Sequence, residues 1–444
     1  MSAAAPSAAT SLGAPSTGIQ SDAPPPKKFI PPVPGSLREA GLTDATVEAL
    51  VLKYLLAVGS ASGGAIAREL CLPNTPVLDL LSALKQQQII GYVGAASAGD
   101  FTYVLTEVGR DRARRYMLEN TYFGAAPVPI ENYIEAVLAQ SITHVHPRPE
   151  NLRNAFSDLL INEQMFATLG PAINSGRGMF LYGYPGNGKT SIAERITRCF
   201  GDDVFIPRVV TVDGMIIKLF DPENHEAIET PRDGIFRTDT FDGRWIKIRR
   251  PTIVVGGELT MESLEVQYNP TTKICEAPFQ MKSNTGTFVI DDFGRQRMRP
   301  IELLNRWIVP LEKRFDFLVL PNGKKVRIPF DQLIIFSTNL EPKDLVDDAF
   351  LRRIPYKINV SDPSEEEFRK LFDIFTPKMG FQPNPAALNA FIEKHYKKTG
   401  RPFRCCQPRD ILLQIRNLCL YQDKPLELTP EYFDFAASMY FTVM

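Results

Sequence analysis

The eight residues from 183 to 190 have the types and spacing that bind a polyphosphate. They read GYPGNGKT, which fits the phosphate-loop pattern G-x-x-x-x-G-K-[ST] at every fixed position. Glycine lets phosphate oxygens reach backbone N–H groups, the lysine adds a mobile cation, and the threonine hydroxyl is a ligand for Mg²⁺. The residues predicted to surround the phosphates are Gly183, Tyr184, Pro185, Gly186, Asn187, Gly188, Lys189, Thr190 and Ser191.

The segments on either side are those that such a loop needs. Residues 178–182 form a short apolar run, as in a buried strand, and residues 191–198 place Ile192 and Ile196 on one face of a helix. The loop is therefore predicted to precede a helix N-terminus, where the helix dipole favours an anion. The alternative is a glycine-rich turn without a ligand, and the order of strand, loop, Lys-Thr and helix argues against it.

Two adjacent carboxylates supply the second part of the chemistry. Residues 287–290 are predicted to form a buried parallel strand, and Asp291 and Asp292 follow where it leaves the sheet. Ligands of open α/β folds bind at that edge. Asp291 is predicted to hold Mg²⁺ directly or through water, and Asp292 to orient or deprotonate an attacking water. An aspartate pair after an apolar run also marks an ordinary strand end, so this prediction depends on the phosphate loop that precedes it.

Further polar and basic residues follow along the chain. Asn339 ends another apolar run, residues 333–339, and is predicted either to contact the attacking water or the terminal phosphate, or only to end a strand. Arg352 or Arg353 offers a guanidinium that can stabilise charge on a transferring phosphoryl group. Arg409 lies at the start of a predicted helix.

In this order the motifs resemble those of AAA+ ATPases, over roughly residues 150–444. The matching stretches are GYPGNGKT at 183–190, FVIDD at 288–292, FSTN at 336–339, DDAFLRR at 347–353 and QPRD at 407–410. The resemblance implies an α/β fold, with a P-loop parallel-sheet core followed by a C-terminal helical lid, that binds ATP and Mg²⁺. A hairpin predicted at 315–328, from Asn-Gly between two alternating strands, is similar to the presensor-1 hairpin of the MoxR-like branch.

The resemblance also implies roles for single residues. Asp291 and Asp292 match the Walker B pair, Asn339 the sensor 1 residue, Arg353 or Arg352 the arginine finger, and Arg409 the sensor 2 residue. The finger of one subunit would complete the site of the next, which gives head-to-tail rings, commonly hexamers in this family. The family has glutamate where this chain has Asp292, one methylene shorter, which leaves slow hydrolysis or a binding-only switch open.

The chain is predicted to contain three folded parts behind a tail rich in Ala, Ser and Pro. The predicted divisions are a disordered tail at 1–35, a winged-helix domain at 36–125, the AAA+ core at 126–361 and the helical lid at 362–444. Residues 36–125 resemble the winged-helix family because helices precede two strands at 89–93 and 101–105, and a last helix follows. Within the core, 204–210, 245–248 and 252–255 are also predicted as strands.

The winged-helix domain is predicted to bind a protein rather than DNA. Its third helix, residues 76–88, offers only Lys85 against Asp79, and the loop at 94–100 has no basic residue. Binding to the phosphates of DNA needs lysine or arginine at these places. The basic residues of its last helix alternate with Asp111 and are typical of a solvated helix face.

Composition limits the function further. The 444 residues are 44% hydrophobic and 23% charged, as in a soluble globular protein of two to three domains, and the net charge of −1 gives no general attraction to nucleic acid or an anionic membrane. No apolar run is long enough to span a membrane. The six cysteines lack metal-ligand spacing and are expected to be reduced thiols in a cytoplasmic protein.

The sequence thus predicts an ATP hydrolase of the AAA+ type that binds ATP and ADP with Mg²⁺. It is expected to remodel or regulate an unidentified protein client as a homo-oligomer. Two alternatives stay open: a DNA-associated ATPase or regulator that uses the winged helix, and a nucleotide-dependent scaffold that hydrolyses slowly.

Overall fold

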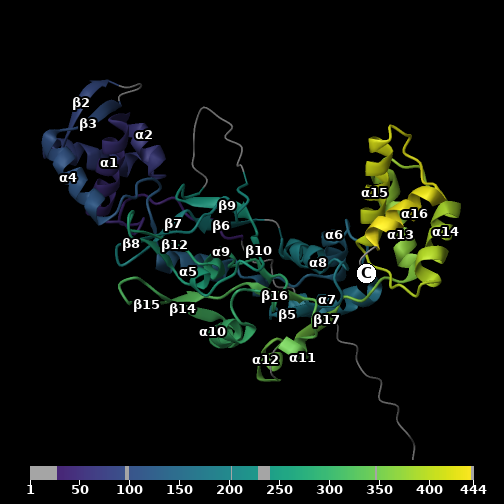
Figure 1. The fold of residues 1–444 in the computed structure, drawn as a ribbon. Coiled ribbons are helices and arrows are strands. Elements are labelled where there is room, and N and C mark those ends of the chain that lie inside the picture. The colour runs from purple at the N-terminus through teal and green to yellow at the C-terminus, as the bar shows by residue number, and fades with distance from the viewer. Residues whose placement is uncertain (1–27, 96–99, 202, 229–240, 346–347, 442–444) are drawn as a thin grey trace, which may run out of the picture.

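The computed structural model describes residues 28–95, 100–201, 203–228, 241–345 and 348–441. A central sheet separates an N-terminal region at one end of the molecule from a group of C-terminal helices at the other (Figure 1). Most of the predicted tail, the tip of the loop at 94–100 and Asp347 lie outside the described residues. No helix within the described ranges combines the length and the apolar character needed to cross a bilayer.

Five parallel strands form the core sheet, in the order β10-β13-β16-β5-β17. Their bounds are β5 Met179–Tyr182, β10 Thr252–Val255, β13 Thr287–Ile290, β16 Leu333–Thr338 and β17 Tyr356–Asn359. Every residue of β13 and β16 is buried, because both faces of the sheet are covered. The strands predicted at the positions of β5, β10, β13 and β16 are confirmed, whereas β17 is not among the predictions.

Helices cover the two faces of the core sheet. Met179 and Leu181 of β5 pack with Ile196 in one hydrophobic cluster, and Phe180 packs with Trp307 in the other. Neighbouring residues of a strand point to opposite faces, which explains this alternation. The helices are α6 Pro149–Ala155, α7 Glu163–Asn174, α8 Lys189–Ile196, α9 Phe279–Lys282, α10 Pro300–Lys313, α11 Pro342–Leu345 and α12 Asp348–Arg353.

A second five-stranded sheet is built from distant parts of the chain, in the order β11-β12-β8-β7-β4. Its strands are β4 Val128–Pro129, β7 Val209–Val212, β8 Met215–Lys218, β11 Gln267–Asn269 and β12 Ile274–Glu276. The pairs β7–β8 and β11–β12 are antiparallel, whereas β4–β7 and β8–β12 are parallel. A separate antiparallel pair joins β6 Asp203–Pro207 to β9 Trp245–Arg249.

The single strand predicted at 204–210 is wrong, because this run forms β6 and β7 in two different sheets. Arg208 separates them. Its N–H donates to the carbonyl of Arg244 at 3.0 Å, and its own carbonyl accepts from the N–H groups of Leu219 and Phe220, each at 3.1 Å. The apolar run therefore changes partners at Arg208, which its residue types do not reveal. The strand predicted at 245–248 is confirmed as β9.

The described residues of the N-terminal region form four helices and a three-stranded antiparallel sheet of order β1-β3-β2. Its elements are α1 Asp44–Val58, β1 Ser60–Ser62, α2 Gly63–Glu69, α3 Asn74–Gln86, β2 Ile90–Ala95, β3 Phe101–Leu105 and α4 Glu107–Glu119. The hydroxyls of Thr43 and Thr106 cap α1 and α4. The prediction that Pro76 starts the third helix is wrong, because α3 begins at Asn74 and proline is tolerated in a first turn. Strand β1 was missed.

A buried ion pair fixes the N-terminal region to the strands behind it. Arg244 and Asp242, just before β9, are 2% and 3% exposed, and Arg244 Nη2 donates to Asp242 Oδ2 at 2.7 Å. Arg244 Nη1 donates to the carbonyls of Ala40 at 2.7 Å and Pro127 at 3.2 Å. These partners explain how a guanidinium is tolerated in the interior. The N-terminal region cannot shift against β9 without breaking these bonds.

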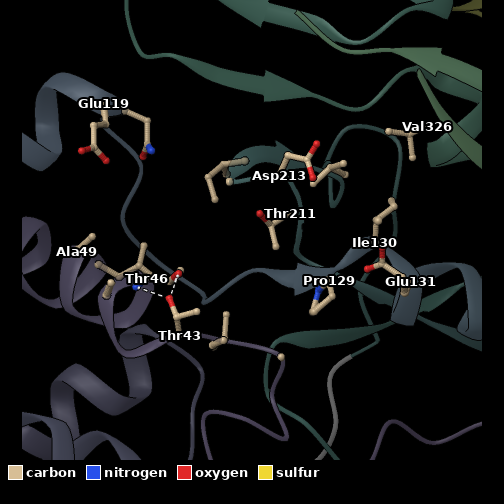
Figure 2. A pocket seen from close by; sticks show the side chains of 18 of the residues that line it. Thr43, Thr46, Ala49, Glu119, Pro129, Ile130, Glu131, Thr211, Asp213 and Val326 are labelled. Carbon is tan, nitrogen blue, oxygen red and sulfur yellow. Dashed lines mark hydrogen bonds between the residues drawn. The ribbon is translucent and has the colours of Figure 1, made fainter. Parts of the chain in front are cut away.

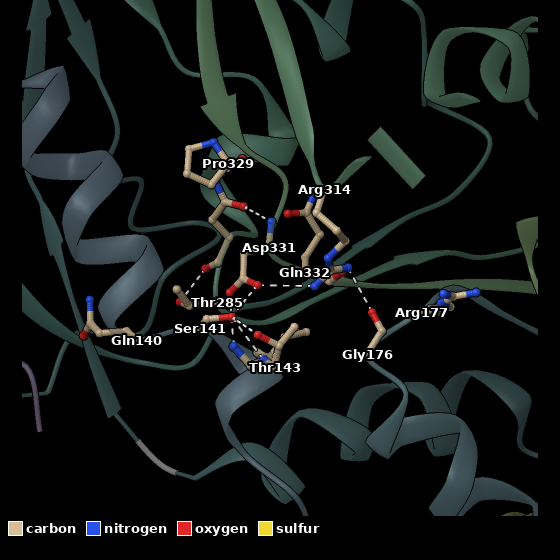
Figure 3. A network of polar contacts seen from close by, with 12 residues as sticks. Gln140, Ser141, Thr143, Gly176, Arg177, Thr285, Arg314, Pro329, Asp331 and Gln332 are labelled. Carbon is tan, nitrogen blue, oxygen red and sulfur yellow. Dashed lines mark hydrogen bonds and ion pairs between the residues drawn. The ribbon is translucent and has the colours of Figure 1, made fainter. Parts of the chain in front are cut away.

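A hairpin and a buried polar network lie at the start of β16. The hairpin predicted at 315–328 is confirmed as β14 Phe315–Val319 and β15 Lys325–Pro329. After it, Asp331 accepts from Ser141 Oγ at 2.7 Å and from Arg314 Nη2 at 3.2 Å, and Arg314 Nη1 donates to the carbonyl of Gly176 at 2.9 Å (Figure 3). The network joins the hairpin to the ends of α7 and of α5, Ile130–Ala139, which fixes one end of β16.

The C-terminal helices pack around a core of their own. They are α13 Glu365–Lys378, α14 Pro385–Ile392, a π-helical turn at Glu393–Lys397, α15 Gln407–Tyr421 and α16 Pro430–Tyr440. Aromatic side chains such as Phe368, Phe391 and Phe433 are buried between them. The segment predicted to be helical, residues 362–444, is helical over most of its described length.

Candidate functional site

The phosphate loop connects β5 to α8, and its glycines have backbone angles that other residues rarely adopt. The angle φ is +135° at Gly183, +85° at Gly186 and +83° at Gly188. A Cβ at Gly183 would lie 2.5 Å from the carbonyl oxygen of Val360, and one at Gly186 would lie 2.6 Å from Cys406 Sγ. The glycines therefore let the loop fit between the core sheet and the C-terminal helices.

The ammonium group of Lys189 lies among three oxygen acceptors. Its Nζ donates to Asn339 Oδ1 at 2.6 Å, to the carbonyl of Gly183 at 2.9 Å and to that of Tyr184 at 3.0 Å. Lys189 is only 7% exposed, and burial lowers the pKa of its amine, while the carboxylates that follow β13 oppose that shift. The ammonium group of Lys189 thus lies at the mouth of the loop and is already hydrogen-bonded.

The ends of β13 and β16 bring the predicted polar residues to the loop. Thr190 Oγ1 donates to Asp291 Oδ2 at 2.7 Å, and Asn339 Nδ2 donates to Asp292 Oδ1 at 3.1 Å. Because Asn339 also accepts from Lys189, one chain of contacts runs from the cation to the Asp292 carboxylate. Asp292 is exposed and has φ of +47°, an uncommon angle for a non-glycine residue that occurs often at functional sites.

Gln296 fixes the turn that carries the two aspartates. Its Nε2 donates to the carbonyls of Asp291 at 2.8 Å and Asp292 at 3.2 Å, and its Oε1 accepts from the N–H of Gly294 at 2.8 Å. Sequence reasoning missed this residue. It lies in a polar stretch where nothing separates it from its neighbours until the turn is folded.

The segment 404–406, just before α15, lies against the phosphate loop. The contacts are the Arg404 guanidinium 4.2 Å from the centroid of the Tyr184 ring, the Cys405 N–H to Asn187 Oδ1 at 3.4 Å, and the Cys406 N–H to the Gly186 carbonyl at 2.8 Å. Asp362, between β17 and α13, accepts from Asn187 Nδ2 at 2.7 Å and pairs with Arg404. Both Asp362 and Arg404 were missed. A prediction of β17 would have drawn attention to Asp362, which follows that strand.

Two of the three predicted arginines pair with acids outside the phosphate loop. Arg409, in the first turn of α15, pairs with Asp410 at 2.9 Å, and its side chain is 59% exposed. Arg353 of α12 pairs with Glu312 of α10 at 2.7 Å, and Arg352 is exposed. The remaining loop residues behave as loop surface, with Pro185 exposed and Ser191 half-buried. The structure therefore gathers Lys189, Thr190, Asp291, Asp292 and Asn339 in one hydrogen-bonded group.

The residues present fit a magnesium ion. Thr190 Oγ1 and Asp291 Oδ2 are hard oxygen donors side by side at the mouth of the loop. Mg²⁺ is commonly bound by one or two such protein groups together with substrate phosphates and water. Across the described ranges, His, Cys, Asp and Glu form no cluster of three or more that could hold a metal ion.

A cavity of about 720 Å³ lies away from this site, between the N-terminal region and the hairpin (Figure 2). Thr43 and Thr46 line one side, and Glu119, Glu131 and Asp213 add acidic groups. The basic residues on its walls are Lys53, Lys324, Lys325 and Arg327. Both charge signs are present and no phosphate-loop residue contributes, so this cavity does not belong to the phosphate site.

Comparisons with known proteins give limited similarity. A family model described as a domain of unknown function (DUF8689) matches residues 364–439, which span the C-terminal helices. No curated protein matches the chain in sequence. Among solved structures, the chain is similar to NtrX from Brucella abortus, with 15% identity and a TM-score of 0.40 over 63% of this chain and 55% of that one. This chain thus spans about half the length of NtrX.

Two further structures are similar to a comparable degree. A model of the complex between subunits BchI and BchD of magnesium chelatase has 16% identity and a TM-score of 0.34, over 65% of this chain and 94% of that one. A RuvB mutant from Thermotoga maritima has 13% identity and a TM-score of 0.35, over 69% and 74%. The α/β class of the chain is carried by its own parallel sheet and phosphate loop.

Proposed function

We propose that this chain is an ATPase of the AAA+ type that binds ATP between the core sheet and the C-terminal helices. The observation that carries the proposal is the chain of contacts from Lys189 through Asn339 to Asp292. The strand order supports it, because β16 lies between β5 and β13 and so holds Asn339 between the loop and the acidic pair. The amide of Asn339 thereby links the cation that binds phosphate, Lys189, to the carboxylate that activates water, Asp292.

Each residue has a defined task in this proposal. The loop N–H groups and Lys189 bind the phosphates, and Thr190 and Asp291 hold Mg²⁺, which when bound neutralises charge on the phosphate oxygens. Asp292 accepts a proton from the attacking water, and Asn339 orients the Asp292 carboxylate by donating from Nδ2 to its Oδ1. The short side chain of Asp292 favours the slow-hydrolysis scaffold as the second candidate.

Steady-state ATP hydrolysis over a range of protein concentrations tests the proposal. We expect turnover per subunit to rise with concentration, and Asp292→Asn to lower kcat by about 10²–10⁴-fold, because it removes the general base. Asp344→Asn, an exposed aspartate of α11, is the matched control and should leave the rate unchanged. Tight ATP binding without turnover in the native chain would make the scaffold the better description.

We also propose that the subunits form a head-to-tail ring in which Arg353 reaches the site of the neighbour. In the single chain Arg353 is held on Glu312 at 2.7 Å, so it would exchange this partner for the neighbour's phosphate. Arg353→Ala should spare nucleotide binding and remove hydrolysis, with Arg352→Ala as the adjacent control. Undiminished turnover in Arg353→Ala, with loss in Arg352→Ala, would assign the finger to Arg352 instead.

We propose that the N-terminal region is a winged-helix domain that recruits a protein client, and that residues 362–444 are a helical lid. The hydrophobic cluster of the N-terminal region is built mainly from residues 37–126, with Val209, Ile216 and Ile274 added from the second sheet. The C-terminal helices have a cluster of their own, and the family match begins at residue 364, next to the start of α13. Residues 36–125 carry eight basic and nine acidic side chains, which favours a protein over DNA. The six free thiols are in keeping with a cytoplasmic protein. Affinity for duplex DNA that falls steeply with salt would contradict the assignment of the N-terminal region.

A further inference from the structure

Asp362 contacts both the phosphate loop and the segment 404–406, although it belongs to neither. It lies where the chain leaves β17 for α13, between the core sheet and the C-terminal helices. Its Oδ1 accepts from Asn187 Nδ2 at 2.7 Å, and the same oxygen pairs with Arg404 Nη1. One carboxylate oxygen thus joins the loop, the connection between the two parts, and the C-terminal helices.

The amide of Asn187 takes its orientation mainly from this contact, because a second acceptor of its Nδ2, the carbonyl of Val360, lies farther away at 3.5 Å. Asn187 is 4% exposed, and its Nδ2 faces Asp362 while its Oδ1 accepts from the N–H of Cys405 at 3.4 Å. A carboxylate accepts hydrogen bonds only, so it fixes which end of the amide faces which way. The phosphate-loop pattern leaves position 187 free, so phosphate binding alone does not account for a buried asparagine there.

The guanidinium of Arg404 depends on the same carboxylate for its charge balance. Its side chain is 17% exposed and lies over the ring of Tyr184. Burial is the main cause of the lowered pKa of the Lys189 amine, and the nearby positive charge of Arg404 adds to it. Two cations at one loop repel each other, and Asp362 is the acid that pairs with Arg404.

We propose that Asp362 is a positioning residue for nucleotide hydrolysis, which holds the segment 404–406 on the phosphate loop by fixing Asn187 and Arg404 together. Its effect on rate rests on the proposed ATPase function, whereas its effect on the position of the C-terminal helices does not. Asp362 itself touches no phosphate in this proposal. The loop and Lys189 therefore keep most of the binding energy, and the loss on removing the carboxylate falls on kcat.

Hydrogen exchange in the nucleotide-free full chain tests the positional part. Asp362→Asn keeps an oxygen for Asn187 but removes the charge that pairs with Arg404. We expect the amide of Cys406, which donates to Gly186, to exchange about tenfold faster in this variant, because the local opening equilibrium shifts. Asp362→Glu should recover part of the protection, because it retains the charge.

The control is Asp434→Asn, an aspartate of α16 that pairs with Lys394 at 2.8 Å and His395 at 2.7 Å. This variant removes a paired carboxylate from the C-terminal helices, away from the phosphate loop. It should leave exchange at 404–406 unchanged. Unchanged exchange in Asp362→Asn would overturn the proposal. If Asp362→Asn does not fold, Arg404→Gln tests the same contact from the other side and should give the same increase.

A double-mutant cycle tests the catalytic part. Asp362→Asn and Arg404→Gln should each lower kcat about tenfold and change the Kd for a fluorescent ATP analogue less than about threefold, and the double variant should be no worse than either one. Independent, multiplying losses, or a loss confined to Kd, would overturn the proposal. A native chain that neither binds nor hydrolyses ATP would refute the proposed function, and the exchange result would still decide the role of Asp362.

Discussion

The two five-stranded sheets of this protein are built by different rules. The core sheet is wholly parallel, and four of its five strands are short, mostly apolar runs. The polar residues of the site follow the carboxyl ends of β13 and β16. The second sheet mixes parallel and antiparallel pairs and includes a strand of two residues, β4. The difference teaches that most of the core sheet can be recognised strand by strand, while the second sheet exists only through pairing between distant segments.

The two sheets also differ in where they place charge. At the core sheet, charged groups gather at the carboxyl ends of the strands, around Lys189 and the acidic pair. A bound ligand could pair with them there. Beside the second sheet, Arg244 and Asp242 are sealed inside and complete each other. In the proposed function, charge at the core sheet serves binding, whereas charge near the second sheet attaches the N-terminal region.

Breaking the buried pair should have the largest effect on stability. Arg244→Met leaves Asp242 buried without its cation, and we expect the free energy of unfolding to fall by about 3–5 kcal/mol. Urea unfolding followed by circular dichroism measures this loss. Arg249→Met, which removes an ion pair with Glu226 in which both side chains are more than two-thirds exposed, is the control and should cost less than about 0.5 kcal/mol. Equal losses in the two variants would mean that Arg244 is not an anchor.

Removing the cation of the core sheet should affect binding rather than folding. Lys189→Met takes away a charged hydrogen-bond donor to the phosphates, and we expect affinity for ATP to fall about 10–100-fold with little change in melting temperature. Anisotropy of a fluorescent ATP analogue measures the affinity. Lys218→Met, on the exposed end of β8 in the second sheet, should leave affinity unchanged. Unaltered affinity in Lys189→Met would contradict the phosphate site.

The smallest expected effect is the pH dependence of stability that Lys53 causes. It reflects the free-energy cost of burying a protonated amine. Burial lowers the pKa of Lys53 to about 8, against an opposing contribution from Glu119. Between pH 8 and about 10.4, the usual pKa of lysine, the unfolded chain binds more protons than the folded one, so stability rises with pH in that window. We expect a gain of about 1–2 kcal/mol from pH 8 to pH 10.

Urea unfolding at pH 8, 9 and 10 measures this slope. Lys53→Met should reduce this slope, because it removes the contribution of the N-terminal region. Burial also lowers the pKa of Lys189, so Lys189→Met should remove a contribution of the same sign from the core sheet. A slope that neither variant changes would show that other groups set the pH dependence.

The sequence predicts four of the five core strands because each is a continuous run of mostly apolar residues that can be recognised without knowledge of its partner. The fifth, β17, is an edge strand with only one buried residue, Ile358, and its pattern is too weak to stand out. The strand predicted at 204–210 fails for another reason. Its apolar residues are correctly placed in strands, but Arg208 divides them between two sheets.

The candidate site follows the same division. Lys189, Thr190, Asp291, Asp292 and Asn339 are predictable because each follows a recognisable strand or belongs to a local pattern. Gln296, Asp362 and Arg404 are not, because their contacts form only when a turn closes or when helices far along the chain reach the loop. The roles of Arg353, Arg352 and Arg409 stay predictions, since they depend on a neighbouring subunit or on bound nucleotide.

The position of β5 in the core sheet has a consequence for synthesis on the ribosome. Met179 pairs with Ile335 and with Tyr356, so both neighbours of β5 are made at least about 150 residues later. At about 5–20 residues per second, the apolar segment MFLY waits roughly 8–30 s for its first partner. The N-terminal region has all its own strand partners by Leu105, and the last residues of its hydrophobic cluster, Val209, Ile216 and Ile274, are also made before Ile335. The yield of native protein in a cell therefore depends on how well the nascent chain shields β5 during that interval.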